Sequence, residues 1–161
     1  MPDGADPSHT PYVTFDLDRF VSAQTGVYEQ ALAELGTGRK RSHWMWFVFP
    51  QLRGLGRSET SRLYGLDGLD EARAFLSHPV LGPRLRAALA AVVAVPGSAV
   101  EILGPIDAVK LRSSATLFLR VAPGDPTFQA VLARFFDGVP DPATDELLRA
   151  GLADQATRQA Q

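Results

Sequence analysis

The segment that decides the fold is residues 109–118, which read Val109-Lys110-Leu111-Arg112-Ser113-Ser114-Ala115-Thr116-Leu117-Phe118. Apolar side chains cover most sides of this segment when it is wound as a helix, so we expect it at the centre of the molecule. Asp107 stands where such a helix would begin. Polar side chains on a central helix must be paired or must face a cavity. The segment therefore predicts a helical core that also carries polar groups of interest.

Helix start and stop signals recur on both sides of this segment. Ser98 with Glu101 has the pattern of a capping box, and His78-Pro79, Asp125-Pro126 and Asp141-Pro142 are typical helix openings. The other expected openings are Asp16, Thr25, Ser42, Ser58 and Asp67. Period-2 alternation is rare and the connections are short. We therefore predict an all-α fold, a single multihelical domain of roughly eight to ten short-to-medium helices.

The length of 161 residues fits one domain with its own core. We expect residues 1–14 to be a flexible leader, residues 15–150 the helical domain and residues 151–161 a frayed tail. There is no cysteine, which excludes disulfides, thiol nucleophiles and thiolate metal sites. No pair of histidines has the spacing of metal ligands, so we expect no metal and no cofactor.

The amino-terminal residues lack the basic and apolar regions of a signal peptide. The longest apolar run, residues 87–95, is far shorter than the about 20 residues that span a membrane. These features predict a cytoplasmic protein without membrane association. The net charge of −2 argues against a nucleic-acid partner.

Positive charge is concentrated in one part of the chain. Residues 39–62 carry a net charge of +5, whereas residues 1–38 carry −5. An amphoteric surface whose neighbouring charges neutralise each other is the simplest explanation. Fourteen of the 16 basic residues are arginine, so we expect the two lysines, Lys40 and Lys110, where an ammonium group is wanted.

The basic stretch is also the most aromatic one, residues 38–51, Gly-Arg-Lys-Arg-Ser-His-Trp-Met-Trp-Phe-Val-Phe-Pro-Gln. A helix over residues 43–49, capped by Ser42 and ended by Pro50, would place Lys40 and Arg41 at its amino end, where an anion is favoured. The same run is apolar all round and could instead be a buried strand.

Two aromatic residues and one histidine in this stretch could contribute to a ligand site. Trp44 or Trp46 could stack on a ring, and His43 is the candidate acid or base because the pKa of histidine is ordinarily near 6.5. The structural alternative is that the aromatic rings belong to the core and that His43 is a hydrogen-bonded structural residue.

Two further segments carry polar groups of interest. In residues 109–118, helical spacing places Lys110 with Ser113 and Ser114 but Arg112 nearly opposite, so these cations should not hold one ligand from this helix alone. Pairing of one of these cations with a carboxylate from elsewhere is the structural alternative.

Residues 51–58 contain two glycines and two arginines before a helix start. They lack the strand and the Gly-Lys-Ser/Thr ending of phosphate loops, so a turn that exposes arginine is favoured.

At these segments the sequence resembles the domain-of-unknown-function 1810 family, mostly bacterial proteins that are often mislabelled calpastatin. The resemblance extends over about residues 15–148. It is carried by residues 19–24, Val27-Tyr28, and residues 38–51, 54–58, 78–85 and 110–118. It implies a mainly helical fold and no established reaction. Together with the segments above, it gives the site candidates Gln24, Tyr28, Lys40, Arg41, His43, Trp44, Trp46, Gln51, Lys110, Arg112 and Ser113.

These candidates lead to two functional hypotheses. The first is a domain that binds, with or without turnover, an anionic ring-containing small molecule such as a nucleotide or an ADP-ribose-like metabolite, with phosphate held near Lys40 and Arg41. Whether such a domain is an enzyme stays open. The alternative is a non-catalytic protein-interaction module that uses the basic, aromatic surface.

Overall fold

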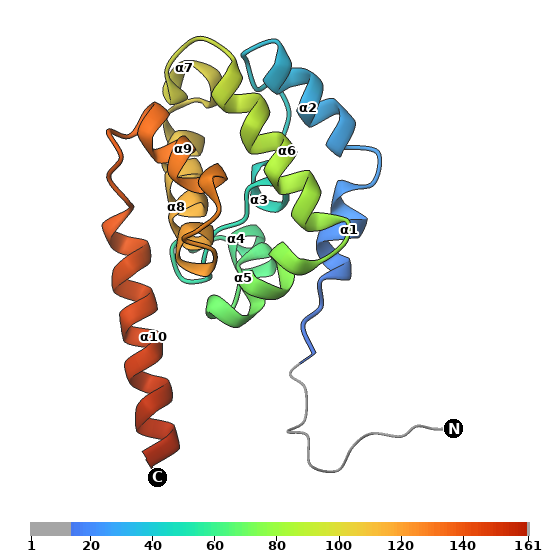
Figure 1. Ribbon diagram of the computed structural model, residues 1–161. Coiled ribbons are helices and arrows are strands. Elements are labelled where there is room, and N and C mark those ends of the chain that lie inside the picture. The colour runs from blue at the N-terminus through green and yellow to red at the C-terminus, as the bar shows by residue number, and fades with distance from the viewer. Residues whose placement is uncertain (1–13, 161) are drawn as a thin grey trace.

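The structure is a computed structural model that describes residues 14–160 (Figure 1). The predicted leader, apart from Thr14, lies outside these residues. Within them the chain forms ten helices, which confirms the all-α prediction and its helix count. They are α1 (Asp18–Gln24), α2 (Tyr28–Gly36), α3 (Met45–Val48), α4 (Glu59–Tyr64), α5 (Gly68–Ser77), α6 (Leu81–Ala94), α7 (Ala99–Leu103), α8 (Pro105–Val121), α9 (Pro126–Phe135) and α10 (Pro142–Ala160).

Helix α8 is the centre of the molecule, as its sequence predicts. It packs against α5, α7, α9 and α10, and α6 covers α2, α5 and α9 (Figure 1). A chain of phenylalanine rings runs through the core, with centroids 5.0 Å apart for Phe20 and Phe75, 5.6 Å for Phe75 and Phe118, and 5.7 Å for Phe118 and Phe128. These rings join α1, α5, α8 and α9 into one hydrophobic core.

Several predicted helix starts are confirmed by the hydrogen bonds that the caps make. Ser98 and Glu101 form both bonds of a capping box at α7. The side chain of Ser58 accepts the N–H of Ser61, and that of Asp125 accepts the N–H of Thr127. His78 caps α6 through Nδ1, which accepts the N–H groups of Val80 and Leu81 at 3.1 and 3.2 Å.

Four other predicted starts are wrong in detail. Asp16 and Thr25 do not cap α1 and α2, whose preceding residues Leu17 and Val27 make no side-chain cap. Asp67 precedes α5 without capping it; the carboxylate of Glu71 accepts the N–H of Asp67 instead, at 2.7 Å. Ser42 does not cap a helix either, because its hydroxyl is bound to a distant glutamate described below.

Helix α10 leaves the body of the molecule at its carboxyl end (Figure 1). It continues as a helix to Ala160, past residue 150, where the sequence predicts a frayed tail to begin. That the tail frays stays a prediction. None of the helices in the described part of the chain is both long and apolar enough to cross a membrane.

Candidate functional site

The two lysines of the chain meet at one carboxylate. Nζ of Lys40, in the loop between α2 and α3, lies 3.0 Å from Oδ2 of Asp107. Nζ of Lys110, one turn further along α8, lies 3.1 Å from Oδ1 of the same residue. These side chains are only 9%, 16% and 17% exposed for Lys40, Lys110 and Asp107, so solvent screens their charges weakly. The structure therefore brings two segments distant in sequence to one place.

Backbone contacts hold the loop that carries Lys40. The N–H of Lys40 donates to the carbonyl of Ile102 at 2.7 Å, which ties the loop to α7. Asp107 lies in the first turn of α8, so both partners of Lys40 come from fixed helices. We call the group Lys40, Asp107, Lys110 and Trp46 the lysine cluster.

The two tryptophans next to the lysines differ in what they offer a ligand. Trp46 is partly exposed, and Nζ of Lys110 lies 3.7 Å from the centroid of its ring, a cation–π contact. Trp44 is 0% exposed, with Nζ of Lys40 5.2 Å from its ring. Trp44 therefore cannot stack on a ligand, and the prediction that it could is corrected; only Trp46 keeps that role as a prediction.

The anion that the loop at residues 39–44 binds is the carboxylate of Glu34. Oε1 of Glu34 accepts the N–H groups of Arg41 and Ser42 at 2.8 and 3.0 Å and the indole N–H of Trp44 at 2.8 Å. Oε2 accepts the hydroxyl of Ser42 at 2.5 Å. At the amino end of this stretch, where the sequence predicts that an anion is favoured, the N–H groups of Arg41 and Ser42 are therefore already bound to a side chain of the protein.

This contact also explains why the predicted helix over residues 43–49 does not form. The hydroxyl and N–H of Ser42 are engaged with Glu34, so neither can cap a helix that begins at His43. Helix α3 is a single turn, Met45–Val48, and its preceding residue Trp44 makes no side-chain cap. Both the long helix and the strand alternative are wrong, because α3 is short and joins irregular segments.

The hydrogen bonds to Glu34 stabilise its charged form. Burial of the carboxylate works in the opposite direction, but the bonds from the Ser42 hydroxyl, the Arg41 N–H and the Trp44 indole outweigh it and lower the pKa of Glu34 to about 2. The group is therefore a fixed negative charge at neutral pH that is satisfied by neutral donors.

Positive charge exceeds negative charge within the lysine cluster, because Lys40 and Lys110 share the single carboxylate of Asp107. The exposed side chains of Arg39 and Arg41, in the loop that carries Lys40, form no ion pair within residues 14–160. One turn after Lys110, on the same side of α8, the buried hydroxyl of Ser114 has no hydrogen-bond partner in the described chain. Burying a hydroxyl without a hydrogen-bond partner lowers the free energy of unfolding by about 1 to 3 kcal/mol, so a polar group next to Ser114 would stabilise the fold.

His43, the candidate acid or base, is exposed. Its imidazole makes no hydrogen bond or ion pair with any described residue, so no second group orients the ring as a general base normally requires. The structural alternative, an internally hydrogen-bonded histidine, does not apply to it within this part of the chain. Its chemical role stays a prediction.

Gln24 and Tyr28 belong to a separate cluster around Arg84 of α6. Nε2 of Gln24 donates to the carbonyl of Phe47 at 2.8 Å, and Oε1 accepts Nη1 of Arg84 at 3.2 Å. The hydroxyl of Tyr28 donates to the carbonyl of Arg84 at 2.8 Å. Burial raises the pKa of Tyr28, and the nearby Arg84 partly offsets this. These contacts tie α1, α2 and α3 to α6, which accounts for both residues structurally.

Arg112 and Ser113 anchor the segment before α10. Arg112 donates from Nε to the carbonyl of Val139 at 2.9 Å and from Nη2 to that of Pro140 at 3.1 Å. The hydroxyl of Ser113 donates to Asp141 at 3.0 Å. Arg112 thus points away from the lysine cluster, as the helical spacing predicts.

Gln51, another predicted site residue, is buried. Its backbone carbonyl accepts the N–H of Leu66 at 2.9 Å, beside an isolated parallel bridge between Leu52 and Leu66.

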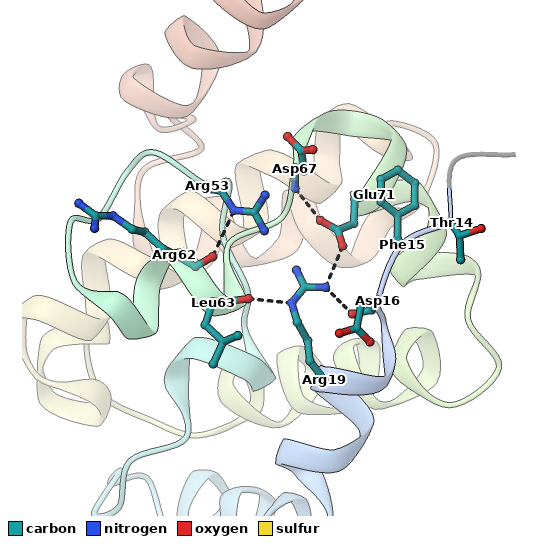
Figure 2. A pocket seen from close by; sticks show the side chains of 9 residues that line it. All are labelled: Thr14, Phe15, Asp16, Arg19, Arg53, Arg62, Leu63, Asp67 and Glu71. Atoms are coloured by element: carbon teal, nitrogen blue, oxygen red, sulfur yellow. Dashed lines mark hydrogen bonds and ion pairs between the residues drawn. The ribbon is translucent and has the colours of Figure 1, made fainter. Parts of the chain in front are cut away.

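A pocket of about 370 Å³ lies elsewhere and contains none of the predicted site residues (Figure 2). Its floor is the ion pair between Arg19 and Glu71, 2.9 Å apart. Reasoning from the sequence missed this arginine pocket as a site. Two signals could have indicated it: Arg19 lies in a motif of the resemblance, and Arg53 lies in the glycine- and arginine-rich segment. The residues that line it are Thr14, Phe15, Asp16, Arg19, Arg53, Arg62, Leu63, Asp67 and Glu71.

Among residues 14–160, no group of three or more histidine or acidic side chains could hold a metal ion. Fold and site together define a small all-α domain with a lysine cluster at its central helix. The family profile described as "Protein of unknown function (DUF1810)" matches residues 14–148, so the chain belongs to the DUF1810 family. This confirms the resemblance read from the sequence motifs.

One solved structure is similar over most of the chain. It is the crystal structure of the conserved hypothetical protein Rv1873 from Mycobacterium tuberculosis, with 51% sequence identity and a TM-score of 0.82. The match covers 84% of this chain and 97% of that one. No curated protein matches the sequence.

Proposed function

We propose that this domain binds an anionic, ring-containing small molecule, such as a phosphorylated nucleoside, at the lysine cluster. The observation that carries the proposal is the meeting of Lys40 and Lys110 at the single carboxylate of Asp107. Two partly buried ammonium groups share one carboxylate there, and this leaves positive charge to attract a second anion. The two lysines of a chain whose other basic residues are arginine both pair with Asp107.

The proposed ligand would occupy the outer side of the cluster. Its phosphate would lie against Lys40, Lys110 and the free guanidinium of Arg41, because the N–H groups of residues 41 and 42 are already bound to Glu34. The ring of the ligand would lie near the exposed part of Trp46, beside the ammonium group of Lys110, which lies over the Trp46 ring. His43 would reach the ligand from the same loop, and turnover would depend on it. We place this binding in the cytoplasm of a bacterium.

The sharpest test neutralises the competing carboxylate. If a ligand anion replaces part of the pairing around Asp107, then Asp107→Asn should raise the affinity for AMP, ADP, ADP-ribose and glucose 6-phosphate, and Lys110→Met should lower it about tenfold or more. Thermal shift measures both, since a ligand at a hundred times its Kd stabilises the fold by about 2.7 kcal/mol. Arg57→Met is the matched control, because Arg57 is an exposed cation outside the cluster.

Several outcomes would reject the proposal. If none of these compounds shifts the melting temperature, the cluster does not bind them. If they bind equally well to the wild type, Asp107→Asn and Lys110→Met, the binding occurs elsewhere. His43→Ala separates binding from chemistry, because it should leave affinity within about twofold if the imidazole acts only on a bound substrate.

A second candidate function is favoured by exposed apolar side chains next to the lysine cluster. Ile106 and Val109 on α8 are 73% and 62% exposed, and they directly precede Asp107 and Lys110, respectively, in the sequence. Apolar side chains beside excess positive charge would suit an acidic, apolar segment of a protein partner. The domain would then be a non-catalytic interaction module.

Peptide display on the immobilised domain tests this second candidate. The selected peptides should combine Asp or Glu with large apolar residues, and they should bind more weakly to a double variant with Ile106→Ser and Val109→Ser. The same variant should bind AMP and ADP-ribose like the wild type if the first proposal is correct. Peptides that bind the double variant equally well would rule out α8 as the docking surface.

A further inference from the structure

The arginine pocket presents unpaired groups of both charges around a fixed floor (Figure 2). Arg19 donates from Nε to the carbonyl of Leu63 at 2.7 Å, from Nη2 to that of Gly65 at 3.1 Å, and from Nη1 to that of Asp16. Glu71, only 3% exposed, accepts both Nη1 of Arg19 and the N–H of Asp67. The floor is therefore satisfied and rigid, and it joins α1 to the segment between α4 and α5.

One guanidinium is held over this floor with its outer edge free. Nε of Arg53 donates to the carbonyl of Arg62 at 3.1 Å, which fixes the direction of the side chain. Its two terminal nitrogens have no partner among residues 14–160, and in Figure 2 they point toward the space above Arg19. The side chain of Arg62 points away from that space. A fixed guanidinium edge fits the two oxygens of a carboxylate or phosphate.

The side of the pocket across Arg19 from Arg53 carries a carboxylate that the floor does not use (Figure 2). The side chain of Asp16 makes no hydrogen bond or ion pair with the described residues, whereas Asp67 lies beside Arg53 with its carboxylate directed away from Arg19. A polyanion that reached across the pocket would be repelled by Asp16. A molecule with one anionic and one cationic end would instead satisfy Arg53 and Asp16 together. The volume of about 370 Å³ suits a compact ligand of this kind.

We propose that the arginine pocket is a second binding site, distinct from the lysine cluster, for a small zwitterion whose carboxylate or phosphate meets Arg53 and whose ammonium meets Asp16. The apolar connection between these ends would lie against Phe15 and Leu63. The site needs no change in the pairing of Arg19 with Glu71.

Matched probes test whether both charges count. We would titrate 4-aminobutanoate and 6-aminohexanoate, the corresponding carboxylates butanoate and hexanoate, and the corresponding alkylammonium ions. Amide chemical shifts of Leu63, Gly65 and Asp67 in the full chain report binding. At least one amino acid should bind about tenfold tighter than the carboxylate and the ammonium of the same length, as expected when a charge-assisted contact is added.

Variants then assign each end of the ligand. Arg53→Gln should lower the affinity for the preferred amino acid about tenfold and abolish that for the carboxylate, whereas Arg57→Gln, a change at an exposed arginine of the same segment, should change neither. Asp16→Asn should remove the advantage of the amino acid over the carboxylate without weakening the carboxylate. Equal binding of amino acid and carboxylate, no effect of Arg53→Gln, or no shift at these amides with any probe would each overturn the proposal.

Discussion

Glu34 organises the loop of residues 39–44 through one side chain. Its carboxylate lies close to the backbone of Arg41 and Ser42 and to the indole of Trp44, and it is largely buried. A charge in such a place is tolerated because each oxygen receives hydrogen bonds. The loop that presents Lys40 therefore depends on a residue that the sequence analysis did not single out.

Glu34→Gln should lower the free energy of unfolding at pH 7 by about 2 kcal/mol. The amide loses the negative charge and turns an NH₂ group toward N–H and O–H donors. Urea unfolding monitored by circular dichroism measures the change. Glu146→Gln, at an exposed glutamate, is the control and should change stability by less than about 0.5 kcal/mol. Equal stability of wild type and Glu34→Gln would contradict this account of the loop.

The same residue makes stability depend on pH in a predictable direction. The pKa of Glu34 is lowered from 4.5 to about 2 in the folded state, so the unfolded state takes up the proton first as pH falls. The contribution of Glu34 is therefore complete above about pH 4.5 and is lost progressively toward pH 2. Unfolding of wild type and Glu34→Gln at several values in this range should show their difference shrinking as pH falls. A constant difference would be inconsistent with the lowered pKa.

At the scale of helices, the sequence predicts correctly those helix starts that are held by hydrogen bonds between neighbouring residues. The sequence predicts Ser58, Ser98 and Asp125 as caps, and each accepts the N–H of a residue two or three positions ahead, a relation that the sequence contains. Ser42 has the same local pattern, but its hydroxyl binds Glu34, eight residues earlier. The residues next to Ser42 do not reveal that a distant carboxylate binds its hydroxyl. The sequence therefore predicts a helix over residues 43–49, which is longer than α3.

The capping box at α7 gives this local reasoning a measurable consequence. Ser98→Ala removes the acceptor for the N–H of Glu101, which now lies 3.1 Å from the Ser98 hydroxyl, and should cost about 1 kcal/mol. Ser77→Ala, at an exposed serine in the last turn of α5, should cost less. Thermal unfolding compares the two variants. If Ser98→Ala costs no more than Ser77→Ala, the capping bond does not stabilise α7.

At the scale of the whole molecule, the candidate site could be predicted only in parts. The sequence draws attention to Lys40 and Lys110 because lysine is rare in this chain. The pairing of Asp107 with Lys110 is an i, i+3 contact on one helix, which the spacing in the sequence encodes. The pairing with Lys40 depends on how α8 packs against α7 and the loop after α2, which no spacing encodes. The arginine pocket was missed for the same reason, since its floor joins Arg19 to Glu71 across 52 positions of sequence.

The last part of α10 allows a prediction about the limits of the domain. Leu148 is buried, and Asp145 pairs with Arg120 of α8 at 2.8 Å, so the first half of α10 belongs to the body. Beyond these residues α10 leaves the body, and Leu152 is 54% exposed. Hydrogen bonds within an isolated helical end stabilise it only marginally.

Ending the chain after residue 150 should therefore change the free energy of unfolding by less than about 0.5 kcal/mol, whereas Leu148→Ala in the full chain should cost about 2 kcal/mol or more. Hydrogen exchange on the intact protein should show fast exchange of amides after residue 150 and protection of those near Leu148. Slow exchange along all of α10, together with a clear loss of stability on truncation, would mean that the tail is part of the folded unit, because only contacts with the body could protect amides that its own sequence leaves exposed.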